Sequence, residues 1–108
     1  MILTLEDDGC IHLYESLDAV VLRVEALDAK ECLRAVFDEY GQQYGIEWIE
    51  PNKRGWIGVT NGRYRLVASG GRDPGVLKAA IDEAGPRGLT ESDRSLVEAV
   101  RDRLLAET

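Results

Sequence analysis

The sequence predicts an α+β fold, with an antiparallel sheet of about six short strands and helices packed on one face of it. Two observations indicate this class. Alternating apolar residues and turn signals predict strands over most of the first two thirds of the chain. Apolar residues three and four positions apart predict helices in the last third. The predicted order is β-β-α-β-β-β-β-α-α, which lacks the regular alternation of a parallel sheet. With 108 residues, the chain is expected to form a single domain, 1–108.

The N-terminal segment is a predicted hairpin followed by a helix. Its strands are Met1–Leu5 and Cys10–Tyr14, and Asp7-Asp8-Gly9 between them is a turn signal because glycine adopts positive φ. Ser16 is a good N-cap for a helix predicted over residues 17–26. The apolar stripe of this helix consists of Leu17, Val20, Val21, Val24 and Leu27. The alternative is a strand with Val20, Leu22 and Val24 on one face.

A second hairpin is predicted from residues 31–37 and 43–49. Apolar residues alternate in both segments, and Asp38-Glu39-Tyr40-Gly41 between them is a reasonable turn. The alternative is a helix that begins at a capping box, because Asp28 is followed three residues later by Glu31.

A third hairpin is predicted after a break in the chain at Pro51–Gly55. Its strands are Trp56–Val59 and Arg63–Ser69, which flank Thr60-Asn61-Gly62. An Asn-Gly pair between apolar runs is the strongest short signal for a hairpin turn. We therefore expect these two strands to pair with each other.

Two helices complete the predicted fold. Asp73 is the expected N-cap of the first, Pro74 takes its first position, and Gly85 ends it. Thr90 is the expected N-cap of the second helix. The predicted apolar stripes are Val76, Leu77, Ala80 and Ile81 in the first helix and Leu96, Val97, Val100, Leu104 and Leu105 in the second.

Charge is distributed unevenly along the chain. The whole chain carries a net charge of −7, and residues 1–50 hold twelve acidic side chains against three basic ones, a net charge of −9 for that half. An acidic surface repels phosphate backbones, so we expect no nucleic-acid partner. The same field attracts a basic protein and speeds its association. Three tyrosines and one tryptophan lie in the same half, namely Tyr14, Tyr40, Tyr44 and Trp48. Tyrosine and tryptophan are common interface anchors.

We expect a soluble, cytoplasmic protein with no membrane partner. The apolar runs are far shorter than the roughly 20 residues that cross a bilayer. The first residues, MILTLEDDG, lack the basic and apolar regions of a secretory signal.

No arrangement of residues in the sequence predicts catalysis, a metal site or a cofactor, so we expect the protein not to be an enzyme. The best alternative uses Cys10 and His12, which are two residues apart on a predicted strand and therefore on one face. Together with Cys32 they would suit zinc. We interpret both cysteines as small, reduced core residues.

The N-terminal half resembles small bacterial immunity proteins encoded beside polymorphic or contact-dependent toxins. The resemblance covers roughly residues 3–50. It consists of an acidic-glycine turn, a strand ending in Leu13-Tyr14-Glu15-Ser16, a short helix ending in Glu25-Ala26-Leu27-Asp28, and a hairpin around Phe37-Asp38-Glu39-Tyr40-Gly41. The resemblance implies a short, acidic cytoplasmic toxin inhibitor that binds a cognate toxin domain through protein–protein contacts.

We therefore interpret the chain as an immunity protein, with a nuclease as the leading candidate for the toxin. The hypothesis places five residues on the toxin-binding surface: Glu15, Asp18, Asp38, Glu39 and Tyr40. Reversing the charge of any of the four acids is expected to slow association. The alternative function is a non-enzymatic regulatory or adaptor domain that acts as a homodimer. The free protein is expected to be a monomer or a homodimer.

Overall fold

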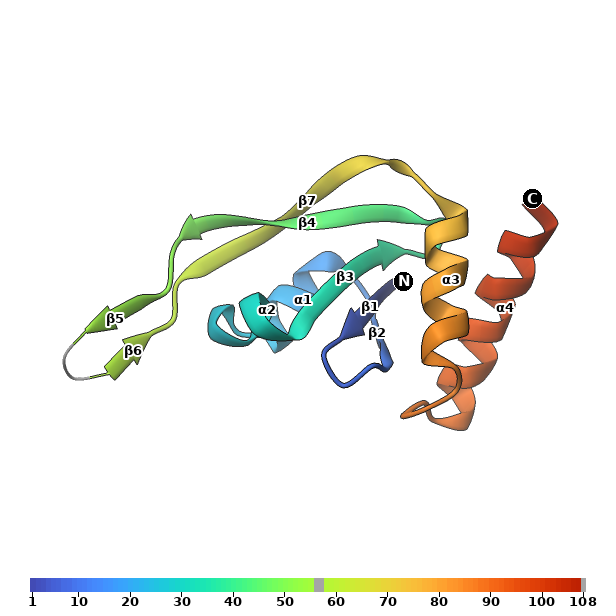
Figure 1. Ribbon diagram of the computed structural model, residues 1–108, viewed down its shortest axis with the longest axis horizontal. Coiled ribbons are helices and arrows are strands. Elements are labelled where there is room, and N and C mark those ends of the chain that lie inside the picture. Colours follow the sequence, from blue (N-terminus) through green and yellow to red (C-terminus); the bar gives the residue numbers. More distant parts are fainter. Residues whose placement is uncertain (56–57, 108) are drawn as a thin grey trace.

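The fold combines four helices with one main antiparallel sheet (Figure 1). The computed structural model describes residues 1–55 and 58–107, and the side chains of residues 27 and 54–60 lie outside this description. The strands of the sheet are β1 (Ile2–Glu6), β2 (Ile11–Tyr14), β3 (Leu33–Asp38), β4 (Gln42–Glu50) and β7 (Arg63–Arg72). The helices are α1 (Leu17–Arg23), α2 (Ala26–Cys32), α3 (Pro74–Ala84) and α4 (Glu91–Glu107), and β5 (Lys53–Gly55) pairs with β6 (Gly58–Thr60). The sheet order is β2-β1-β3-β4-β7. The α+β class and the antiparallel sheet are confirmed, whereas the predicted strand number and order are only partly right.

Helices cover both faces of the sheet, so the prediction of helices on one face was wrong. Leu3 and Phe37 belong to a core cluster with α3 and α4, whereas Ile2 and Val36 belong to a second cluster with α1 and α2. Adjacent residues of a strand point to opposite faces, and β1 is apolar at consecutive positions. Both of its faces are therefore buried, and in the view of Figure 1 β1 and β2 lie between the two helix pairs.

The segment after β2 forms two short helices instead of one. α1 begins as predicted, with the Ser16 hydroxyl oxygen accepting a hydrogen bond from the backbone N–H of Ala19 at 3.1 Å. α2 was not predicted, and it begins after Glu25 and not at the proposed capping box. Ala26 and Ala29 are buried against the sheet, and their small side chains let this helix approach closely. The following strand therefore starts at residue 33 instead of residue 31.

The second predicted hairpin is confirmed. β3 pairs antiparallel with β4 through Val36 opposite Tyr44 and Phe37 opposite Gln43. Gly41 in the connecting turn has φ of +93°, and a Cβ atom there would lie 2.9 Å from the backbone of Pro74. The turn therefore requires glycine both for its conformation and for its close contact with the start of α3.

The third predicted hairpin was wrong, because β7 pairs with β4 and not with β6. The register runs from Gln42 opposite Arg72 to Glu50 opposite Arg63, and the ribbon then continues as β5 paired with β6. Asn61-Gly62 is thus a junction within one long ribbon and not its turn. Of the predicted strand over residues 56–59, Trp56 and Ile57 lie outside the described residues.

We call the projecting part of this ribbon, residues 46–55 and 58–66, the arm. It extends away from the helices (Figure 1) and gives the molecule principal dimensions of 52 × 29 × 21 Å.

The two C-terminal helices begin as predicted, and the first of them also ends as predicted. The Asp73 carboxylate accepts a hydrogen bond from the backbone N–H of Val76 at 3.2 Å, and Gly85 ends α3 with φ of +63°. The Thr90 hydroxyl oxygen caps α4 by accepting from the backbone N–H of Asp93 at 3.1 Å. Most of the predicted stripes of these helices, including Leu77 and Leu104, are buried in the first core cluster. The prediction was wrong for Val76, Leu96 and Leu105, which are 41%, 49% and 42% exposed.

Candidate functional site

The outer surface of α1 exposes a large apolar side chain among carboxylates. Val20 and Val24 face the sheet and are 0% and 7% exposed, whereas Leu22 points the opposite way and is 83% exposed. Asp18, four positions before Leu22, shares its side of the helix, and Glu25 lies in the connection between α1 and α2; both acids are exposed. We call Asp18, Leu22 and Glu25 the α1 face. The strand alternative would place Val20, Leu22 and Val24 on one face. The exposure of Leu22, with both valines buried, excludes it.

A pocket lies beside the α1 face at the base of the arm. We call it the arm-base pocket. It has a volume of about 360 Å³ and is lined by Val21, Glu25, Ala26, Ile49, Asn61, Gly62, Arg63 and Tyr64. Its walls come from α1, from the start of α2 and from both strands of the arm. The Tyr64 hydroxyl donates to the carbonyl oxygen of Val24 at 2.6 Å, which holds β7 against the end of α1.

The pKa of the Tyr64 phenol is raised to about 12, because burial disfavours the phenolate and the carboxylate of Glu6 repels it. At neutral pH the Tyr64 hydroxyl therefore remains a hydrogen-bond donor.

The turn residues predicted to bind the toxin are engaged within the protein. One carboxylate oxygen of Asp38 accepts hydrogen bonds from the backbone N–H groups of Tyr40 and Gln42 at 2.9 and 3.0 Å. The Glu39 carboxylate lies 3.5 Å from both the N-terminal amino group and Nη1 of Arg103. These contacts stabilise the turn and offset much of its negative charge.

Tyr40 joins α4 to the same turn. The guanidinium carbon of Arg103 lies 4.5 Å from the centre of the Tyr40 ring, a cation–π contact, and Arg103 also donates to the carbonyl oxygen of Glu39. The carbonyl oxygen of Tyr40 accepts from Arg72 Nε. Tyr40 is half-exposed and carries structural contacts, so its predicted role in binding stays a prediction.

The remaining predicted residues lie on the side of α1. Ile2 pairs with Tyr14 on one side and with Asp38 on the other, so the ends of β2 and β3 meet at one end of the sheet. Glu15 follows β2 there and lines an open groove of about 460 Å³. The other residues of that groove are Met1, Leu13, Tyr14, Arg23, Asp93 and Leu96. The structure thus brings Glu15 near α1, which carries Asp18.

A polar cluster lies on the face of the first hairpin that packs toward α1. The Glu6 carboxylate accepts hydrogen bonds from the Thr4 and Tyr14 hydroxyls at 2.7 and 3.1 Å. His12 lies between two carboxylates, with Nε2 3.0 Å from Asp8 and Nδ1 3.9 Å from Glu6. The pKa of Tyr14 is raised to about 12 by burial and by Glu6, and that of Asp8 is lowered by hydrogen bonds from Cys10 N–H and His12. These contacts account for each charge in the cluster without a ligand.

The two cysteines have different surroundings. Cys10 precedes β2, and its sulfur packs against Gly88 in the connection between α3 and α4. Cys32 ends α2, and burial together with the carboxylates of Asp7 and Asp28 raises the pKa of its thiol. Both cysteines are free thiols, and no group of three potential metal ligands occurs in the described part of the chain.

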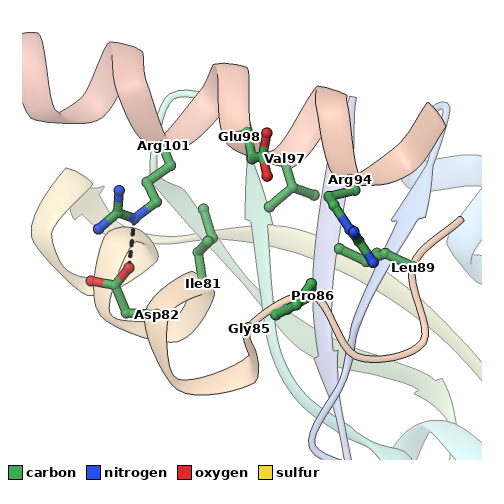
Figure 2. Close-up of a pocket in the computed structure, with 9 residues that line it drawn as sticks. All are labelled: Ile81, Asp82, Gly85, Pro86, Leu89, Arg94, Val97, Glu98 and Arg101. Carbon is green, nitrogen blue, oxygen red and sulfur yellow. Dashed lines mark hydrogen bonds and ion pairs between the residues drawn. The ribbon is translucent and has the colours of Figure 1, made fainter. Parts of the chain in front are cut away.

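A groove between α3 and α4 is the remaining hollow of note. Figure 2 shows Ile81 and Val97 in its middle, with Arg94 toward one end and the Asp82–Arg101 pair toward the other. Asp82 Oδ1 lies 2.6 Å from Arg101 Nε, and Asp82 Oδ2 lies 2.9 Å from Lys78 Nζ. These bonds lower the pKa of Asp82. The Asp82–Arg101 pair joins the two helices across the groove, which has a volume of about 350 Å³, whereas the Lys78–Asp82 pair lies within α3.

Comparisons of the chain with family models, with curated proteins and with solved structures found no match. Within residues 1–55 and 58–107, no helix is both long enough and apolar enough to cross a membrane.

Sequence reasoning missed Leu22, Glu25 and Ile49 as surface candidates. A signal for Leu22 was present, because it lies off the apolar stripe of its own predicted helix. Ile49 had no such signal, because its exposure depends on a change of register in the arm.

Proposed function

We propose that this protein is an immunity protein that binds a cognate bacterial toxin domain in a stoichiometric complex. It would neutralise the toxin in the cytoplasm by binding alone, without turnover. The observation that carries the proposal is the α1 face, where Leu22 is 83% exposed and the exposed acids Asp18 and Glu25 come before and after it in the chain. Transferring an exposed leucine side chain out of water contributes about 2 kcal/mol. An apolar anchor surrounded by charges therefore suits a protein partner that covers it.

The charge around this face supports a basic partner. Residues 15–31 hold five acidic side chains, Glu15, Asp18, Glu25, Asp28 and Glu31, against the basic Arg23 and Lys30. The Asp18 carboxylate makes no hydrogen bond or ion pair within the described residues, so its charge is available to a partner. Exposed charges of one sign attract an oppositely charged protein and raise its association rate. A nuclease domain, which must bind phosphate backbones, is the leading candidate.

Co-expression with the product of the adjacent gene, as the candidate toxin, tests the proposal. The expected result is that cells expressing the toxin domain survive only when this protein is present. The two chains should also elute together in a fixed molar ratio from a sizing column. Continued cell death, with the two proteins eluting separately, would contradict the proposal.

Reversing one charge on the α1 face tests where the toxin binds. Asp18→Lys is expected to lower the association rate about tenfold at low salt, because a rim charge acts mainly through steering. The matched control is Asp102→Lys, the same charge change at an exposed position of α4. Stopped-flow kinetics at two salt concentrations measures both variants. Equal rates for Asp18→Lys, Asp102→Lys and the unaltered protein would remove Asp18 from the binding surface.

One observation favours the second candidate, a homodimeric adaptor. β7 is the last strand in the sheet order, and no strand within the described residues pairs with its outer edge. Unpaired strand edges can join two copies of a chain. Sedimentation at micromolar concentration distinguishes the two functions: a dimer favours the adaptor, and a monomer favours the toxin inhibitor.

A further inference from the structure

The arm-base pocket has apolar walls and a charged rim. Val21, Ala26, Tyr64 and Ile49 form the walls, and Ile49 is 50% exposed. Glu25 and Arg63 lie at the rim, with Arg63 3.8 Å from the carboxylate of Glu50. This combination can take up one apolar side chain and leave a charged neighbour of that side chain near Glu25.

A change of register in the arm exposes Ile49. Trp48 pairs with Tyr64, and the next pair is Glu50 with Arg63, so Ile49 is an extra residue in β4. Such a bulge redirects a side chain without breaking the ribbon. The Trp48 and Tyr64 rings contact each other with centres 5.8 Å apart, whereas Ile49 lines the pocket.

Polar contacts hold the walls of the pocket in place. The Asn52 side chain donates to the carbonyl oxygen of Ala26 at 3.1 Å and accepts from the backbone N–H of Gly62 at 2.8 Å. The Asn61 amide lies 3.3 Å from the Glu25 carboxylate. With the Tyr64 bond described above, these contacts join both strands of the arm to the connection between α1 and α2. A pocket formed in advance binds a side chain at lower entropic cost than one that must assemble.

We propose that the toxin domain inserts one apolar side chain into the arm-base pocket and places a lysine or arginine beside Glu25. This inference rests on the proposed function. The pocket is continuous with the α1 face, because Glu25 belongs to both. A second copy of this chain is a poorer occupant, because residues 15–31 beside the pocket hold five acids against two bases and would repel the same segment of another copy. A basic toxin carries the opposite charge and suits the same surface.

The test measures binding of the toxin domain to the full chain by calorimetry and stopped-flow kinetics. Ile49→Ser removes an apolar wall, and we expect it to weaken the complex about tenfold. The weaker binding should come from a faster dissociation rate, and its size should not depend on the salt concentration. A rim charge, in contrast, acts on the association rate and depends on salt. Val76→Ser is the matched control: Val76 is 41% exposed on α3 and does not line the pocket. It is expected to bind like the unaltered protein.

Two results would overturn the inference. If the unaltered chain binds the toxin domain and Ile49→Ser binds it equally well, the pocket is not used, although the proposed function stands. If the unaltered chain neither binds nor protects cells, the proposed function and the inference fail together. Should Ile49→Ser fail to fold by circular dichroism, Val21→Thr replaces it. This nearly isosteric change puts a hydroxyl in the same wall, and equal binding by that folded variant would also overturn the inference.

Discussion

The buried hydroxyl of Tyr64 connects the arm to the end of α1. Its bond to the carbonyl oxygen of Val24 crosses forty positions of sequence, and the Tyr64 ring packs with Trp48. The pKa of the phenol is raised to about 12 in the folded protein, whereas an unfolded tyrosine has a pKa of about 10. Between these two values the unfolded chain releases a proton that the folded chain keeps. The free energy of unfolding is therefore at its full value below pH 10 and falls as the pH rises from 10 to 12.

Replacing Tyr64 tests this coupling. Tyr64→Phe is expected to lower the free energy of unfolding at pH 7 by about 1 kcal/mol, because the Val24 carbonyl loses its donor. It should also reduce, but not abolish, the loss of stability between pH 10 and 12, since Tyr14 has a raised pKa of about 12 as well. Urea denaturation at pH 7, 10 and 11.5 measures both effects. An unchanged loss of stability at high pH in the variant would contradict this assignment.

The predicted binding residues form two groups. Those in one group contact residues of the same chain that are remote in sequence, and those in the other group do not, within the described residues. Glu15 and Asp18 are exposed acids beside or on α1, as an interface requires. Asp38, Glu39 and Tyr40 form an equally acidic turn in the sequence. Arg103 and the N-terminus approach this turn only in the folded chain. Composition could therefore identify the acidic half, but not which of its charges are compensated.

At the scale of elements, the clearest failure of prediction concerns Asn61-Gly62. The local pattern favours a hairpin turn, but Asn52 accepts a hydrogen bond from the backbone N–H of Gly62, and β4 pairs along β7. A Cβ atom at residue 62 would lie 2.1 Å from the carbonyl oxygen of Glu50. Glycine is therefore needed here for the close approach of two backbones, a long-range reason that a turn signal does not reveal.

A single added methyl group tests this explanation. Gly62→Ala is expected to lower the free energy of unfolding by about 2 kcal/mol, because the new Cβ would overlap the Glu50 backbone and the arm must shift. Gly71→Ala in β7 is the matched control, since nothing lies within 4 Å of its added Cβ. Chemical denaturation compares the two variants. Equal stabilities for Gly62→Ala and Gly71→Ala would show that the backbones do not meet as described.

The helix caps show where local sequence signals are sufficient to predict the structure. The caps of α3 and α4 were predicted residue by residue, because side-chain and glycine caps depend only on neighbouring residues. α2 was missed because its seven residues are too few to show a helical stripe of apolar side chains. Burial of Ala26 and Ala29 against the sheet stabilises it, and this burial is a tertiary effect.

At the scale of the whole molecule, the fold class followed from the sequence, but the arrangement of layers did not. Apolar residues at consecutive positions of β1 implied burial on both faces, and the structure places a helix pair on each. This arrangement puts α1 on the opposite face of the sheet from α3 and α4, beside the base of the arm. The α1 face and the arm-base pocket thus form one surface, on the acidic side of the chain.

The affinity of the Leu22→Ser variant for the toxin domain is the most direct test of the proposed binding surface. Leu22 is 83% exposed, so its replacement should change the free energy of unfolding by less than about 0.5 kcal/mol. If the toxin covers this side chain, titration calorimetry should show the dissociation constant rising about thirtyfold, because the buried leucine contributes about 2 kcal/mol. An unchanged dissociation constant for this folded variant would contradict a binding surface centred on α1.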